Sequence, residues 1–145
     1  MTPPDPADGA LSAMTQRFMN GELDPVTFDH RAHLRVAFDV VRTQSFIEAL
    51  RCYLAGIDVL VNRAGVPEKR NVTITIAFLS LVAERVQRFL CLGHSETSDE
   101  CVFEAFLAAN PDLEAGNALR TWYSQERLNS DFARTHFALP DRVNV

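Results

Sequence analysis

The sequence predicts an all-α fold: a single-domain helical bundle of three long core helices plus shorter flanking helices. Apolar residues recur three and four positions apart along most of the 145-residue chain, which is typical of helices with one buried face. No segment alternates apolar and polar residues with the period of a strand. Cap-forming residues precede the periodic segments and Gly or Pro follows them, as expected at helix ends.

The start of the chain is predicted to be a lead-in followed by a short helix. Residues 1–8 contain three prolines and two aspartates, so we expect them to be disordered, with residues 9–145 forming the domain. Residues 10–20 repeat apolar side chains at helical spacing, and Gly21 closes that pattern. This short helix is expected to lie against the main body.

Three long helices follow, and residue types suited to helix ends delimit them. Thr27 or Asp29 can cap the first by accepting a hydrogen bond from a free amide, and the helix is expected to run to about Arg42. Ser45 is placed to cap the second, and Gly65 to end it in the left-handed conformation.

The third long helix is predicted over roughly residues 72–92, with Asn71 as its cap. It is apolar around much of its girth, which is typical of a central helix. Shorter helices are expected further on, including one built from the apolar residues between 113 and 123. Ser130 is placed to cap the last helix.

Composition narrows the function classes. The formal net charge is −5 and basic residues are scattered, which argues against nucleic acid as a partner. The longest apolar stretch, residues 74–83, is too short to span a membrane. The three cysteines are widely spaced, and their odd number favours reduced thiols in the cytoplasm.

The clearest candidate site lies in residues 28–38, which read FDHRAHLRVAF. His30 and His33 are three positions apart, so on a helix they share a face with Ala37 and are expected to point inward. The opposite stripe, expected to face solvent, consists of Arg31, Arg35, Asp39 and Arg42. Two inward imidazoles form a candidate site because titratable groups with perturbed pKa values cluster at functional positions.

The leading hypothesis is a small cytoplasmic enzyme that uses this pair for acid/base chemistry on a largely apolar small molecule. Isomerisation, cyclisation or dehydration would suit such a site without a cofactor. We expect the cavity between the first and third long helices. The predicted catalytic residues are His30, His33, Asn71 and Tyr123, and the predicted substrate-binding residues are Thr75, Ala37, Phe38 and Trp122.

Two alternatives stay open. In the first, His30 and His33 bind a divalent metal (Fe, Mn or Zn), with a third ligand from Asn71, Glu84 or a more distant carboxylate. In the second, the protein is a non-catalytic helical module that binds a small molecule or a partner, with a homodimer as one form, and its histidines are structural. An open cavity beside the histidines would favour the enzyme, and imidazoles fully paired with backbone groups would favour the module.

Residues 28–37 resemble the signature of a mostly uncharacterised family of small bacterial helical proteins, Phe-(Asn or Asp)-His-x-x-His-(Leu or Val)-x-x-Ala. The similarity extends through residues 65–75, 103–111 and 123–130. In that family His-Glu often stands just before a Thr-x-Thr at the start of the third long helix. Here Asn71 and Val72 precede Thr73-Ile74-Thr75. If His-Glu supplies metal ligands in the relatives, this chain lacks them, which favours a metal-free pocket or a changed activity. The resemblance implies no known reaction.

Overall fold

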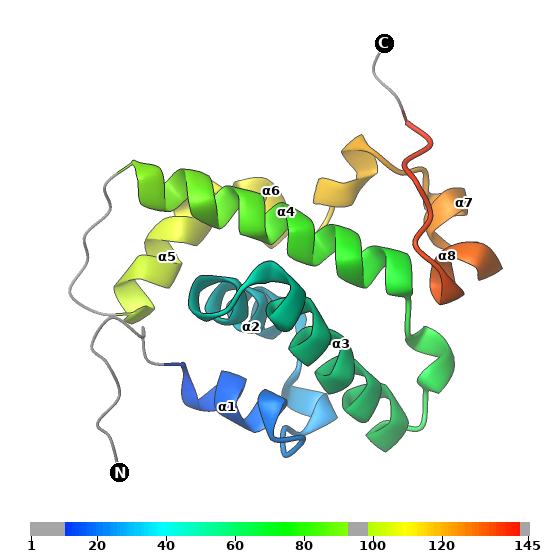
Figure 1. Ribbon diagram of the computed structural model, residues 1–145, viewed down its shortest axis with the longest axis horizontal. Coiled ribbons are helices and arrows are strands. Elements are labelled where there is room, and N and C mark those ends of the chain that lie inside the picture. The colour runs from blue at the N-terminus through cyan, green and yellow to red at the C-terminus, as the bar shows by residue number, and fades with distance from the viewer. Residues whose placement is uncertain (1–10, 93–98, 143–145) are drawn as a thin grey trace.

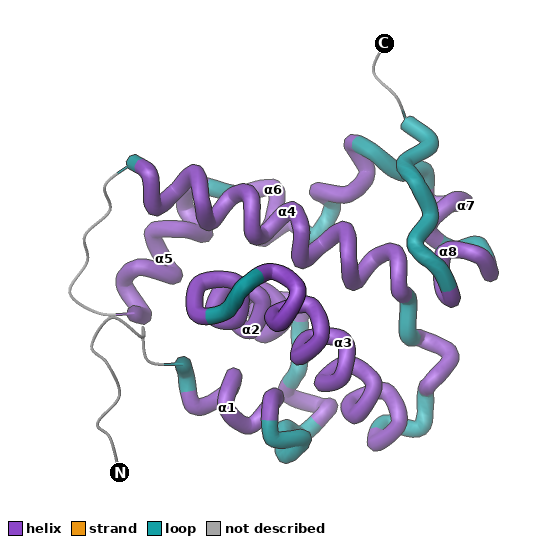
Figure 2. Tube along the Cα trace, viewed as in Figure 1, coloured by secondary structure: helices purple, strands orange, loops and turns teal. Residues whose placement is uncertain are grey.

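The computed structural model describes residues 11–92 and 99–142, and these residues form helices and no strand (Figure 2). The prediction of an all-α fold is confirmed. The expected lead-in at residues 1–8 lies outside the described residues. Within the described ranges, no helix is long and apolar enough to cross a membrane.

The three longest helices in the described part of the chain are those the sequence predicts. They are α2 (His30–Thr43), α3 (Phe46–Arg63) and α4 (Val72–Cys91). Each of the three contacts the other two, and α4 runs across the molecule with α2 and α3 packed along one side of it (Figure 1). Their shared interior is one continuous apolar cluster. Its fully buried side chains include Leu34, Phe38, Tyr53, Leu79 and Val82.

The predicted caps form as expected. Asp29, Ser45 and Asn71 each accept a hydrogen bond from the backbone N–H three positions on. Gly65, just beyond α3, has a φ of 74°, the left-handed conformation that glycine adopts at little cost. The starts of α2 and α4, where the candidate residues lie, are therefore set by local interactions.

Helix α1 (Ala13–Met19) packs against α2 and α3. Its Phe18 is fully buried and lies directly on the backbone of α3 at Gly56. A Cβ at Gly56 would lie 2.2 Å from the Phe18 ring, closer than any real contact, so this position requires glycine. Phe18 also contacts the rings of Phe28 and Tyr53, at centroid distances of 5.3 and 5.5 Å.

The prediction of one helix over the apolar residues 113–123 is wrong. The last third of the described chain folds as α5 (Asp99–Ala109), α6 (Pro111–Ala115), the 3-10 helix η3 (Ala118–Thr121), α7 (Gln125–Leu128) and α8 (Asp131–Thr135). Gly116 has a φ of 78° and ends α6 in the left-handed conformation. The chain turns there and brings η3 and α7 beside the first half of α4.

The segment after α8 is anchored to the start of α4 (Figure 1). The Thr73 hydroxyl donates to the carbonyl of His136 at 2.7 Å and accepts from the N–H of Ala138 at 2.9 Å. The Tyr123 hydroxyl donates to the Ala138 carbonyl at 2.8 Å. These bonds hold the end of the described chain against α4 and place α7 over one side of the site described below.

The expectation that Arg35 and Asp39 face solvent is also wrong. Both are buried, with 6% and 2% of their surface exposed, because α1 and α5 cover this side of α2. The Arg35 guanidinium donates to Asp39 at 3.2 Å and lies over the ring of Phe103 in α5. Asp39 also accepts from the Thr15 hydroxyl at 2.7 Å and from the N–H of Ser12 at 3.2 Å.

Candidate functional site

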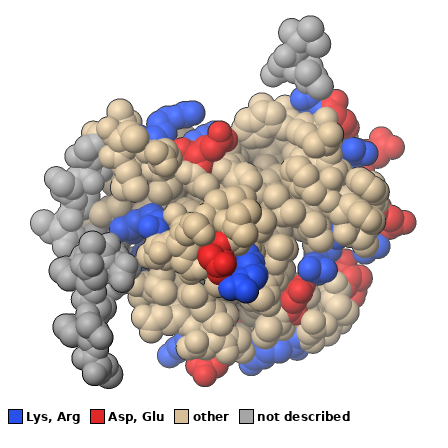
Figure 3. All heavy atoms as spheres, viewed as in Figure 1, with Lys and Arg blue, Asp and Glu red and all other residues tan. Residues whose placement is uncertain are grey.

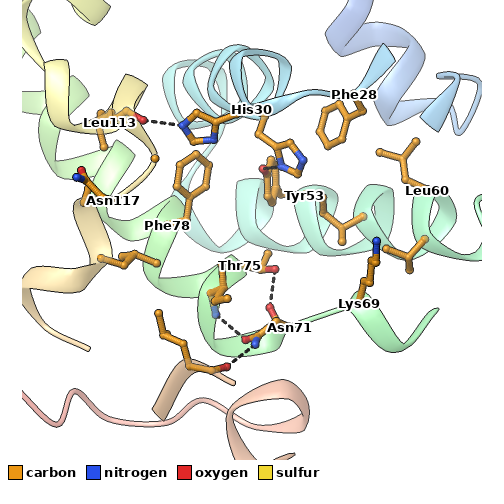
Figure 4. Close-up of a pocket in the computed structure, with 18 of the residues that line it drawn as sticks. Phe28, His30, Tyr53, Leu60, Lys69, Asn71, Thr75, Phe78, Leu113 and Asn117 are labelled. Carbon is orange, nitrogen blue, oxygen red and sulfur yellow. Dashed lines mark hydrogen bonds between the residues drawn. The ribbon is translucent and has the colours of Figure 1, made fainter. Parts of the chain in front are cut away.

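A cavity of about 730 Å³ lies between α2, α3, the first half of α4 and residues 113–128 (Figure 4). Much of its wall is apolar, and this wall includes Ile57, Leu60, Val61, Ile74, Phe78 and Leu128. The volume is in the range of small-molecule sites, which combine an apolar wall with a few placed polar groups. Four of the predicted site residues line it: His30, His33, Asn71 and Thr75.

His30 is the first residue of α2, and a backbone carbonyl fixes its ring. Its Nε2 lies 2.7 Å from the carbonyl oxygen of Leu113 in α6. A carbonyl can only accept, so Nε2 carries a proton, and in the neutral ring the lone pair is on Nδ1. Gly116 packs against the same ring edge, since a Cβ there would lie 3.5 Å from Nε2. The C-terminal end of α6 therefore packs against the His30 ring and fixes its orientation.

His33 lies one turn further along α2 and is more enclosed. The Phe28 ring packs on it with centroids 4.0 Å apart, and its Nδ1 lies 3.2 Å from the Tyr53 hydroxyl. The pKa of His33 is lowered to about 4, first by burial and then by the neighbouring His30, while Asp29 partly opposes the shift. His33 is therefore a neutral imidazole at physiological pH.

Tyr53 determines which nitrogen of His33 carries the proton. The tyrosine is 1% exposed, and burial raises its pKa, so the hydroxyl keeps its proton. His33 Nδ1 is the acceptor that the structure gives this buried hydroxyl, and a buried hydroxyl proton requires one. Tyr53 thus donates to Nδ1, which leaves Nε2–H of His33 as a hydrogen-bond donor.

A bidentate ion pair holds α6 in the position that His30 requires. Both terminal nitrogens of Arg85 in α4 donate to the Asp112 carboxylate at 2.9 Å, and one of them also donates to Asn110 at 2.9 Å. The hydrogen bonds from Arg85 lower the pKa of Asp112, which therefore stays ionised. Because Asp112 precedes Leu113, the pair positions the carbonyl that accepts from His30.

Asn71 and Thr75 line the cavity, but they are engaged in fixing α4 (Figure 4). Asn71 Oδ1 accepts from the N–H of Ile74 at 2.9 Å, and Nδ2 donates to the Leu128 carbonyl at 2.7 Å. The Thr75 hydroxyl donates to the Asn71 carbonyl at 2.7 Å. Asn71 therefore caps α4 and ties α7 to it, so its amide is a positioning group at this wall.

The other four predicted site residues do not line the cavity. Ala37 and Phe38 are fully buried in the core. Phe38 is five positions from His33, about 140° around the helix, and packs on Phe103 and Phe106 with centroid distances of 5.3 and 5.0 Å. Tyr123 points to the C-terminal segment, where its hydroxyl bonds to Ala138. Its neighbour Trp122 is 39% exposed.

The site does not assemble a metal-ligand set in the described part of the chain. No three His, Cys, Asp or Glu side chains there lie close enough to hold one ion. The Nε2 of His30 is already committed to the Leu113 carbonyl, and Glu84 lies outside the cavity, beside a shallow hollow near Phe46. Among the described His, Cys, Asp and Glu side chains, none joins His30 and His33 as the third protein ligand that catalytic sites use.

Sequence reasoning missed three contributors to the site. In the sequence, Tyr53 is one more residue of the apolar face of α3. A buried tyrosine hydroxyl needs a hydrogen-bond partner, and this requirement could have indicated a polar contact at this position. The Leu113 carbonyl is invisible in a sequence because every residue has one. Lys69 belongs to a short 3-10 helix that no sequence pattern marks, and it lines the cavity.

No known protein family, curated protein or solved structure matches this chain. The resemblance carried by residues 28–37 therefore stays a prediction.

Proposed function

We propose that this protein is a small cytoplasmic enzyme that transfers protons on a largely apolar small molecule, with His30 and His33 as its acid/base pair. One observation carries the proposal: both imidazoles line the same apolar cavity of about 730 Å³. Their hydrogen bonds leave a lone pair on Nδ1 of His30 and an N–H donor at Nε2 of His33. Such a pair suits proton abstraction next to a carbonyl.

In this mechanism His30 is the base. Its Nδ1 takes a proton from the carbon beside the substrate carbonyl, and the Leu113 carbonyl, which accepts from Nε2–H, stabilises the positive charge that the ring acquires. The geometry also keeps the ring in one tautomer before the substrate binds. If the His30 ring returns the proton to another carbon, the product is an isomer; if it gives the proton to a hydroxyl on the β-carbon, the C–O bond breaks, water leaves and the product is the dehydrated carbonyl compound.

His33 is the electrophilic partner. As a neutral imidazole it donates Nε2–H to the substrate carbonyl oxygen and stabilises the enolate that forms, while Tyr53 holds its Nδ1. A neutral donor in an apolar surrounding is suited to this role because water, which would screen the interaction, is displaced. The different hydrogen-bond partners of the two imidazoles thus give His30 the role of base and His33 the role of hydrogen-bond donor.

A solvent-exchange experiment tests the proposal without knowledge of the substrate. 4-Phenyl-2-butanone is incubated with the protein in D₂O, and loss of its α-proton signals is followed by NMR. We expect exchange at least about tenfold above buffer, and exchange at the buffer rate for His30→Ala and His33→Ala. His136→Ala is the matched control because His136 does not line the cavity. Equal exchange in all variants, each folded by circular dichroism, would reject the mechanism.

A second candidate is a small-molecule-binding module without catalysis. The observation that favours it is that each imidazole already has a partner within the chain, Leu113 for His30 and Tyr53 for His33. In that case ligands would perturb the amide signals of cavity residues while exchange in D₂O stayed at the buffer rate. The two measurements together separate the candidates.

A further inference from the structure

The ionisable side chains that line the cavity are unusual for this chain. The protein has 19 acidic and 14 basic residues, and charges of both signs are interspersed on the face shown in Figure 3. Among the described residues that line the cavity, however, none is Asp or Glu. The lysine and arginine residues among them are Lys69 and Arg120. The cavity lining therefore carries basic but no acidic side chains, although the protein as a whole is acidic.

Lys69 is the only lysine in the sequence, where the other thirteen basic residues are arginines. It is the last residue of the 3-10 helix η2 (Pro67–Lys69). Its side chain reaches from η2 toward the α3 wall beside Leu60 (Figure 4). Its ammonium group has no hydrogen bond or ion pair with the described part of the chain, whereas the next residue, Arg70, pairs with Asp58.

The surroundings of Lys69 favour a ligand with a single negative charge. The apolar residues Leu60, Val61 and Val66 line the cavity together with this ammonium group. A phosphate would call for several donors, and the nearby start of α4 is already capped by Asn71. A lysine ammonium is a compact point charge that one carboxylate can neutralise.

We infer that the ligand of this cavity is an amphipathic carboxylate: its carboxylate pairs with Lys69, its apolar body lies along Ile57 and Leu60, and its other end meets His30 and His33. This inference rests on the proposed function and names its substrate class. Asn117 lies on the opposite side of the cavity from Lys69 (Figure 4). Arg120 is three residues further along, in the 3-10 helix η3 that begins after Asn117. Arg120 adds positive potential there, and Lys69 is the partner of the carboxylate.

Two probes with the same apolar body test the charge requirement. 4-Phenylbutanoate and 4-phenylbutanamide are titrated separately into the ¹⁵N-labelled protein at pH 8, and dissociation constants are taken from amide shifts of cavity residues. We expect the carboxylate to bind about fivefold more tightly than the amide, as one partly exposed ion pair provides. Lys69→Gln should remove that preference and leave the affinity for the amide unchanged, and Lys69→Arg should retain the preference.

The single lysine permits a direct measurement as well. Reductive methylation with ¹³C-formaldehyde labels Lys69 and the chain's α-amino group, and Lys69→Arg assigns the two signals. We expect the Lys69 methyl signal to move on addition of 4-phenylbutanoate and to stay in place with 4-phenylbutanamide. A signal that is indifferent to the carboxylate would show that Lys69 is not its partner.

The outcomes separate this inference from the proposed function. Equal affinity for the two probes, or loss of the preference in Arg120→Gln but not in Lys69→Gln, overturns the inference. Neither result bears on proton exchange with the neutral ketone, which tests the histidines alone. If neither probe shifts the signals of cavity residues, the inference also fails, and ketone exchange in D₂O then decides separately whether the proposed function stands.

Discussion

Helix α2 carries two polar clusters that differ in how completely they are satisfied. The closed cluster joins Arg35 and Asp39 to Thr15 and Ser12 of the N-terminal segment, and it is buried. The open cluster consists of His30, His33 and Tyr53, and it lines the cavity. The members of the two clusters on α2 lie within ten residues of sequence, and they differ in burial: Arg35 and Asp39 are buried, whereas His33 is half-buried and His30 is exposed.

A polar group can take part in binding or catalysis only if its hydrogen-bonding capacity is not already used within the protein. The buried Asp39 carboxylate accepts hydrogen bonds from the Arg35 guanidinium, the Thr15 hydroxyl and the Ser12 N–H, so little of its hydrogen-bonding capacity is left for a ligand. His33 has one partner and is neutral, so it can be enclosed without a counter-ion and still offer one N–H to the cavity. The closed cluster is suited to stability and the open cluster to binding.

The largest effect is expected from breaking the closed cluster. Asp39→Ala removes the carboxylate to which Arg35, Thr15 and Ser12 all donate and should lower the free energy of unfolding by about 3–5 kcal/mol, measured by urea denaturation. Thr15→Val removes one donor to the same carboxylate and should cost about 1–2 kcal/mol. A loss below about 1 kcal/mol in Asp39→Ala would mean that this cluster does not stabilise the fold as described.

An intermediate effect is expected from acid acting on the open cluster. The pKa of His33 is lowered to about 4 in the folded protein, against about 6.5 in the unfolded chain. The unfolded state therefore binds more protons between these values. The stability that His33 contributes is fully present above pH 6.5 and is lost as the pH falls toward 4.

Between pH 7 and pH 5 this loss should reach about 2 kcal/mol. The measurement is the free energy of unfolding at several pH values for the wild type and for His33→Gln, which has no proton to take up at this position. Both proteins share the acid response of their carboxylates, so the difference between the curves reports His33. Parallel curves would show that His33 is not kept neutral by the fold.

The smallest change in stability is expected at the support of the open cluster. Arg85→Gln removes the bidentate contact with Asp112 and should cost about 1 kcal/mol. Its larger consequence is local, because the Leu113 carbonyl is then no longer fixed against His30. We expect the ¹⁵N signals of the His30 ring to show a mixture of tautomers and ketone exchange in D₂O to slow.

A matched control separates this role from general destabilisation. Arg134→Gln removes an exposed arginine that pairs with Asp131 and donates to the Glu68 carbonyl, away from α6. It should leave the His30 ring signals as in the wild type. Unchanged His30 signals in Arg85→Gln would show that the ion pair does not position this imidazole.

The three long helices and the position of the two histidines on the first of them can be predicted from the sequence alone. The caps at Asp29, Ser45 and Asn71 are interactions between residues three apart, and the apolar periodicity of α2, α3 and α4 is likewise local. Both are therefore readable without knowledge of the fold. Helical periodicity likewise places His30 and His33 on one face of the first long helix.

The surroundings of each helix face depend on the packing of segments that are distant in sequence. The sequence predicts that Arg35 and Asp39 face solvent, but α1 and α5 cover this side of α2 and bury both residues. The partners of the imidazoles, Tyr53 and the Leu113 carbonyl, lie 20 and 83 residues away in sequence. A helical period reports which side chains share a face, but burial and hydrogen-bond partners depend on the packing of distant segments, and no local pattern records that packing.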